Sequence, residues 1–185
     1  MVAFSAGDSG SPPHVAGNSG KSGGLVLKVD HQPNAGWQAV GATENGDILS
    51  ASGAPVVLNE EVHLAAVWDA PELRLFVNGS LAGEESFEER PGPSSRVFRI
   101  GTNVFNGENW VGAFNGRIDE VRVSNVVRYA EDFTPEERFE PDEHTLALYH
   151  FDEGEGNALI DSSGNGHHGQ IHGASWVCVD GESRQ

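Results

Sequence analysis

The sequence predicts an all-β fold, in which two antiparallel sheets pack as a β-sandwich. Glycine (24) and proline (9) are frequent in the chain of 185 residues, without a G-x-y period, and this composition is typical of many short strands joined by turns. Short apolar or alternating runs recur between turn residues. No window of about 12 residues follows the period of a helix. Two packed sheets are the simplest way to bury the apolar faces of such strands.

The expected strands are short and evenly spaced. Before them, residues 5–24 are rich in Gly, Ser and Pro, which predicts a flexible loop. Asn45-Gly46 and Asn78-Gly79 tolerate the positive φ of tight hairpin turns. At 134–139 a threonine N-cap followed by proline predicts one helical turn. The predicted strands are 24–30, 36–43, 47–52, 62–69, 73–78, 97–101, 117–124, 146–151 and 170–177.

The best-defined pair is the hairpin formed by 62–69 and 73–78. Leu73, Leu75 and Val77 occupy every second position, which is the period of a half-buried strand. A proline lies in the separator and cannot continue a ladder, so the chain must turn there.

Composition limits the partners and the cellular setting. Lys and Arg number 11 against 28 Asp and Glu, a net charge of −17, so nucleic acid and anionic membranes are not expected partners. No run reaches the roughly 18 apolar residues of a transmembrane helix. Residues 1–5 lack the basic and apolar parts of a signal peptide, which predicts a cytoplasmic protein or a piece of a longer exported one. The single Cys178 cannot form an internal disulfide.

Several motifs together resemble one known family. The motifs are 63–79, Phe98-Arg99-Ile100-Gly101, 114–123, 148–156, 161–166 and Gly173-Ala174-Ser175-Trp176. With these motifs, the chain resembles over residues ~24–177 the laminin-G-like jelly rolls of the concanavalin A-like lectin/glucanase superfamily. The resemblance implies a jelly-roll sandwich and a non-catalytic module that recognises carbohydrate or protein within a larger exported or cell-surface protein. The alternative is a structural interaction domain without a ligand site.

The order of these motifs departs from the family. The segment 146–176 resembles the family's opening strands, yet here it comes last. The chain is therefore either a fragment that joins one domain to the start of the next, or a permuted, nearly complete sandwich, which we favour because sandwich termini often lie close together. A missing strand would leave an unpaired sheet edge and allow self-association. The predicted parts are a loop or truncated strand at 1–24, the main sandwich at 25–140, this segment at 141–178 and a tail at 179–185.

The resemblance also implies a calcium ion. Members of the superfamily often bind one through acidic turn residues, and calcium prefers six to eight oxygen ligands from flexible loops. The alternative is that these residues cap tight turns through their own hydrogen bonds. The candidate ligands are Asp161 and Asn165, with Asp119, Glu120, Asp152 or Glu153.

Catalysis is not expected. Glucanases of the resembled superfamily carry an E-x-D-x-x-E strand, and a retaining glycosidase needs two carboxylates about 5 Å apart. The corresponding stretch, Arg117-Ile118-Asp119-Glu120-Val121-Arg122, has no glutamate at its first or last place. A degenerate glucanase is the remaining enzymatic alternative.

A sugar site is predicted in the loop 103–112. Sugar sites combine an exposed aromatic face with a few polar groups. This loop offers Trp110 with Asn103, Asn106 and Asn109, and Trp37 is a further aromatic candidate. The alternative is a lid that packs over the edge of the sandwich.

Overall fold

The computed structural model describes residues 2–4, 14–18, 23–30, 36–86, 88, 92–102, 105–106, 109–110 and 112–177. All regular elements within these ranges are strands, and none of the described segments is a helix that could cross a lipid bilayer. The chain separates into two compact units. The first is Met1–Ile118 with Val127–Glu136, and the second is Asp119–Val126 with Glu137–Gln185.

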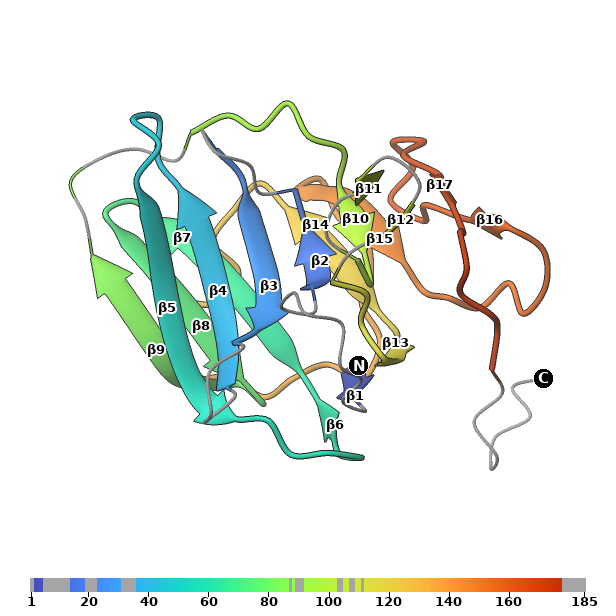
Figure 1. Cartoon of the computed structure of the whole chain (residues 1–185), viewed down its shortest axis with the longest axis horizontal. Helices are drawn as coiled ribbons and strands as arrows, with labels where there is room; N and C mark the ends of the chain where they lie inside the picture. The colour runs from blue at the N-terminus through green and yellow to red at the C-terminus, as the bar shows by residue number, and fades with distance from the viewer. Residues whose placement is uncertain are drawn as a thin grey trace. The chain divides into compact units, whose positions relative to one another are not determined.

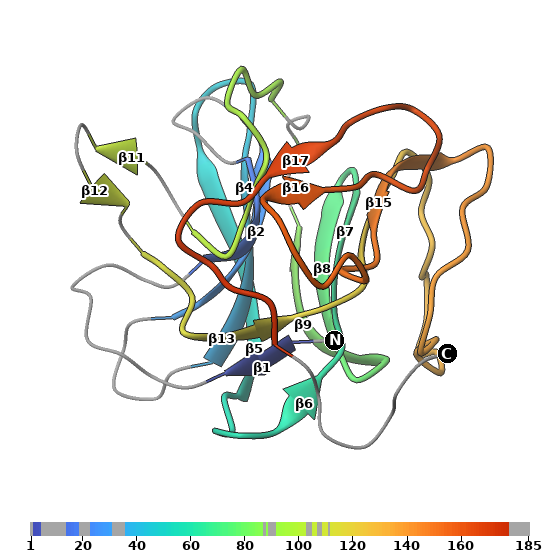
Figure 2. The same ribbon diagram turned by 90° about the vertical axis from the view of Figure 1, so that its right-hand side faces the viewer.

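The described strands of the first unit form four antiparallel sheets (Figures 1 and 2). The orders are β10-β2-β3-β4-β5, β7-β8-β9, β13-β1-β6 and β11-β12. The strands are β1 (Val2–Phe4), β2 (His14–Gly17), β3 (Leu25–Val29), β4 (Gly36–Ala42), β5 (Ile48–Pro55), β6 (Glu61–Val62), β7 (Leu64–Asp69), β8 (Glu72–Val77), β9 (Ser80–Ser86), β10 (Arg99–Ile100), β11 (Phe105–Asn106), β12 (Asn109–Trp110) and β13 (Gly116–Ile118).

The five-stranded sheet and the β7-β8-β9 sheet pack face to face, with β7, β8 and β9 behind β3, β4 and β5 in Figure 1. Alternate residues of β4 and β8 point into the core between them, as the period of a strand requires. This arrangement confirms the predicted two-sheet antiparallel sandwich. The core residues are Val15, Val29, Trp37, Ala39, Ala51, Leu73 and Leu75.

Glycines allow two close approaches between these sheets. A Cβ at Gly41 of β4 would collide with the indole ring of Trp68 from β7, so Trp68 packs directly on the backbone of the facing sheet. At the edge of the two sheets, a Cβ at Gly53 of β5 would collide with the carbonyl of Ala82. A Cβ at Gly83 of β9 would collide with the backbone of Ser52. The edge strands of the two sheets therefore approach backbone to backbone.

The second unit has two small sheets. β14 (Val121–Ser124) pairs antiparallel with β15 (Thr145–Tyr149), and β16 (Ala158–Leu159) pairs with β17 (Gly169–Gln170). Figure 2 shows the latter pair side by side. The Arg122 guanidinium lies 4.2 Å from the centre of the Phe139 ring, a favourable cation–π distance. The buried apolar residues of the unit are Phe139, Ala147, Leu148, Tyr149 and Leu159.

Some elements differ from the expectation. The predicted loop 5–24 contains β2, because Val15 is buried in the core. The predicted strand 117–124 is interrupted at Asp119 and Glu120. The predicted strand 170–177 is regular only at its start. Residues 134–139 form no helical turn, since the backbone N–H of Phe139 donates to the Glu120 carboxylate instead of to the preceding turn.

Candidate functional site

Glu120 links three segments of the second unit. Its side chain is 6% exposed. One carboxylate oxygen, Oε1, lies 2.9 Å from Nδ1 of His150 and 3.4 Å from Nη1 of Arg138. The other, Oε2, lies 3.1 Å from Nδ1 and accepts the backbone N–H of Phe139 at 3.1 Å. The buried carboxylate is thus stabilised by hydrogen bonds and by one guanidinium, as a buried charge requires.

These contacts fix the orientation of the His150 ring. Because a carboxylate only accepts hydrogen bonds, Nδ1 carries a proton, and a neutral imidazole held in this way would present a lone pair at Nε2. Within the described part of the chain no hydrogen bond reaches Nε2. Backbone strain accompanies the pair, since Glu120 has φ = 50° and Phe151, next to His150, has φ = 59°. Positive φ at such residues is costly and tends to gather at functional sites.

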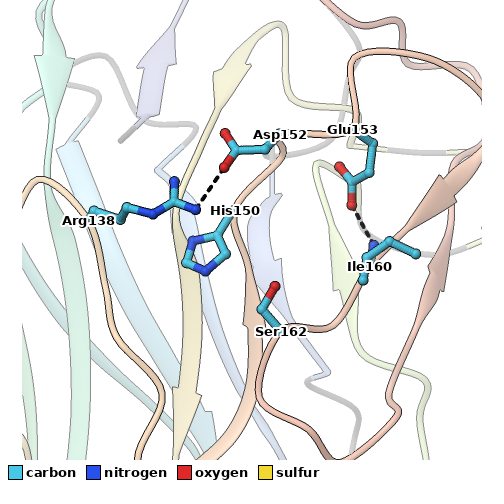
Figure 3. A pocket seen from close by; sticks show the side chains of 6 residues that line it. All are labelled: Arg138, His150, Asp152, Glu153, Ile160 and Ser162. Atoms are coloured by element: carbon cyan, nitrogen blue, oxygen red, sulfur yellow. Dashed lines mark hydrogen bonds and ion pairs between the residues drawn. The ribbon is translucent and has the colours of Figure 1, made fainter. Parts of the chain in front are cut away.

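His150 lies in the wall of an open pocket of about 280 Å³ (Figure 3). Nη2 of Arg138 lies 2.8 Å from Oδ2 of Asp152. The other wall holds Glu153, whose Oε1 accepts the backbone N–H of Ile160 at 2.6 Å. The pocket therefore combines charged and hydrogen-bonding groups with one aliphatic side chain. The lining residues are Arg138, His150, Asp152, Glu153, Ile160 and Ser162.

Negative charge dominates the surroundings. The described residues of the second unit include ten Asp and Glu against two arginines, a net charge of −8 with neutral histidines. Burial raises the pKa of Asp119, and the charges of Glu120 and Asp152 raise it further. The hydrogen bond with Asp152 raises the pKa of Arg138, so the guanidinium stays charged.

Asp161, the first predicted calcium ligand, uses both oxygens within the fold. Oδ1 accepts the backbone N–H groups of Leu148 and Ser163, each at 2.9 Å. Oδ2 accepts the Ser163 hydroxyl at 2.8 Å and the backbone N–H of His167 at 2.9 Å. Burial opposes ionisation, but these hydrogen bonds outweigh it and lower the pKa of Asp161 to about 2.

Asn165, the second predicted ligand, acts beside Asp161 on the edge of β15 that faces away from β14. Its Nδ2 donates to the carbonyls of Thr145 and Leu146. The backbone N–H of Ser162 donates to Leu148, whose own N–H binds Asp161. The turn 161–165 therefore supplies the partners that a neighbouring strand would otherwise supply.

The remaining predicted ligands do not fit a calcium ion as their side chains stand. Glu120 and Asp152 are brought together, but the guanidinium of Arg138 binds one oxygen of each, which leaves too few free oxygens for the six to eight ligands of calcium. Asp119 accepts the backbone N–H of Glu120. In the described ranges no three His, Cys, Asp or Glu side chains are grouped as a metal site requires. Calcium binding stays a prediction.

The sugar role of Trp37 is wrong, because its side chain is buried in the core of the sandwich. The predicted sugar loop is described only in its backbone. β11 and β12 form a short hairpin in which Phe105 pairs with Trp110 and Asn106 with Asn109. Asn103 lies outside the described residues, as does Cys178. The binding role of Trp110 and the three asparagines therefore stays a prediction.

Sequence reasoning missed four residues of the pocket: Arg138, His150, Ile160 and Ser162. His150 and Asp152 lie two positions apart at the end of the predicted strand 146–151, and this pair of polar side chains was an available signal. Nothing in the sequence indicates that Arg138 and Glu120, 18 residues apart, form an ion pair.

Two antiparallel sheets that pack face to face define the class of β-sandwich domains. A family model described as the concanavalin A-like lectin/glucanases superfamily matches residues 4–133. The chain therefore belongs to the laminin-G-like family of that superfamily, as the motifs predicted. No curated protein and no solved structure matches the chain. Glu120 falls within the matched range, whereas all six residues that line the pocket lie beyond it.

Proposed function

We propose that this chain is a non-catalytic recognition module that binds carbohydrate, as part of a larger exported or cell-surface protein. The observation that carries the proposal is the pocket of the second unit, where polar side chains surround the aliphatic Ile160. Convergent polar groups around an apolar wall are typical of small-ligand sites. The superfamily contains lectins and glucanases, so carbohydrate is the ligand class it favours.

Each wall suits one part of a sugar ring. The lone pair at Nε2 of His150 accepts a hydrogen bond from a ring hydroxyl, and the exposed guanidinium of Arg138 donates to a ring oxygen. Ser162 has a hydroxyl with no hydrogen bond among the described residues, so it can both donate and accept. Ile160 is 43% exposed and offers an aliphatic contact to C–H groups. The volume of 280 Å³ is just below the usual range of about 300–1,000 Å³ for ligand pockets, which suits a single ring.

The state of Glu120 supports a role without catalysis. Hydrolysis of a glycosidic bond needs one carboxylate to transfer a proton and another to act as nucleophile or base. Glu120 is buried and both its oxygens already hold donors from the protein. Asp152 is tied to Arg138. We therefore assign these carboxylates to the support of the pocket.

The predicted sugar loop and the predicted calcium ion are treated separately from the pocket. Trp110, with Asn103, Asn106 and Asn109, is proposed as a separate sugar contact of the first unit, since an aromatic face stacks on sugar rings. Calcium is not part of the proposed pocket, because Arg138 already binds both Glu120 and Asp152.

A glycan array with the full chain, followed by calorimetry on the glycans retained, tests the proposal. Ser162→Ala removes a pocket hydroxyl that makes no hydrogen bond within the described fold, so it should keep the melting temperature. One lost hydrogen bond of about 1 kcal/mol weakens binding about fivefold. Ser175→Ala, an exposed serine of the same unit outside the pocket lining, is the matched control and should bind like the parent. Retention of no glycan would contradict the proposal and favour a purely structural sandwich.

A further inference from the structure

We infer that the sugar bound by this pocket carries a positively charged amino group, as an unacetylated hexosamine does. This inference rests on the proposed function, because it specifies the ligand of the same pocket. It follows from the charges that line the pocket and from one carboxylate whose charge has no counterion within the described part of the chain.

Glu153 is that carboxylate. Its Oε1 accepts a short hydrogen bond from the backbone N–H of Ile160. Its Oε2 is buried and accepts no hydrogen bond from the described residues, and no ion pair joins Glu153 to a described cation. The side chain as a whole is half-buried, and a nearby positive charge would stabilise its carboxylate by electrostatic attraction. A cation in the adjoining pocket would supply it without having to reach Oε2, because charge–charge attraction acts over several ångströms.

Asp152 gives the cation a point of contact. Its side chain is 50% exposed, and Oδ2 binds Arg138. No hydrogen bond within the described residues involves Oδ1, so this oxygen can accept one from an ammonium group. Arg138 does not neutralise the pocket, since it is shared between Asp152 and Glu120 while Glu153 has no such partner. Three carboxylates therefore stand against one guanidinium.

The negative charge of the whole second unit also favours a cationic ligand. Its net charge of −8 produces a negative potential that attracts cations and repels anions. Uronic acids and sulfated sugars are thus disfavoured, and neutral sugars gain nothing from the potential. With the ammonium beside Asp152 and Glu153, the ring hydroxyls of the same sugar can meet Nε2 of His150 and the hydroxyl of Ser162, which line the same pocket (Figure 3).

Calorimetry with four disaccharides tests the inference on the full chain. The probes are the β-1,4 dimers of glucosamine, N-acetylglucosamine and glucose, and a disaccharide that contains glucuronate. We expect the glucosamine dimer to bind at least tenfold more tightly than the two neutral dimers, and the uronate probe to bind most weakly. Added salt should weaken the binding of the glucosamine dimer more than that of the neutral dimers, because salt screens charge.

The variant Glu153→Gln tests whether Glu153 causes the preference for the glucosamine dimer. It removes the charge and keeps an oxygen for the Ile160 N–H, so we expect the preference for the glucosamine dimer to fall about tenfold. Glu155→Gln is the matched control, because Glu155 is an exposed acid of the same loop outside the pocket lining. An equal loss in both variants would show nonspecific attraction to an acidic chain and would overturn the inference.

A measurement on the parent chain covers the case in which Glu153→Gln does not fold. The amide proton of Ile160, which is bonded to Glu153, should shift in NMR spectra on addition of the glucosamine dimer. Equal or tighter binding of neutral dimers would overturn the inference and leave the proposed function in place. Binding of none of the four probes, nor of any glycan on the array, would overturn both.

Discussion

Glu120 and His150, 30 residues apart in the sequence, are joined by a contact of 2.9 Å between Oε1 and Nδ1. The pair couples the start of β14 to the end of β15, the two strands of one small sheet. The same carboxylate also binds Arg138 and the backbone N–H of Phe139. The charge of Glu120 therefore helps to hold His150 and Arg138 in their positions in the pocket wall.

Glu120→Gln should destabilise the second unit by about 2 kcal/mol. The neutral amide loses its charge-assisted hydrogen bonds to His150 and Arg138 and places an NH₂ group against at least one donor. Urea unfolding measures the change. Glu137→Gln, at an exposed position of the same unit, is the control and should stay within about 0.5 kcal/mol of the parent. A similar small effect at Glu120 would show that the cluster adds little to stability.

Asp161 should make the stability depend on acid pH. Its pKa is lowered from 3.8 to about 2 in the folded state, so its contribution is present above the unfolded pKa and is lost as the pH falls from about 4 to about 2. We expect a loss of about 1–2 kcal/mol from this change in pKa. Unfolding of the parent and of Asp161→Asn should therefore converge at low pH. A constant difference down to pH 2 would show that the charge is not involved.

Gly41→Ala should destabilise the sandwich by about 1–3 kcal/mol, because the new methyl group would overlap the ring of Trp68 and force the sheets apart. Thermal unfolding with tryptophan fluorescence reports on the same contact. Gly169→Ala is a matched control, since a Cβ there meets only Leu159 at ordinary distances from 3.4 Å. An equal effect of both substitutions would mean that glycine flexibility, and not the collision, is responsible.

Asn165→Ala should expose the edge of β15. It removes the donor to the carbonyls of Thr145 and Leu146, which costs about 1 kcal/mol and leaves unpaired acceptors that another chain can bind. Sedimentation at increasing concentration should show more self-association than in the parent. Asn157→Ala, at an exposed position of the same unit, should sediment like the parent. A monomeric Asn165→Ala at high concentration would count against the role of the turn as an edge cover.

The family resemblance and the arrangement of side chains give opposite predictions for calcium. Because the oxygens of Asp161 are taken by protein donors and Arg138 lies between Glu120 and Asp152, we expect equal melting temperatures in millimolar calcium and in EDTA. An ion that binds only the folded state would raise the melting temperature by several degrees. A rise of that size would support the calcium prediction.

Local chemistry was readable from the sequence, but long-range partners were not. The alternation at Leu73 and Leu75 predicted a strand with one buried face, and both residues are in the core. Val15 was hidden in a segment whose composition predicts a loop, since burial in the tertiary structure can outweigh local composition. Asp161 was identified as important because acids in glycine-rich turns either bind metals or cap turns, and only the fold shows its four donors. The partners of Glu120 depend on how distant segments meet.

The dispersal of the pocket along the chain has a practical consequence for the choice of expression fragments. A fragment trimmed to the residues matched by the family, 4–133, would retain Glu120 but remove Arg138, Phe139 and His150, leaving its carboxylate without these donors. Such a fragment would lack every residue that lines the pocket. Its failure to bind a glycan would therefore say nothing about the intact chain.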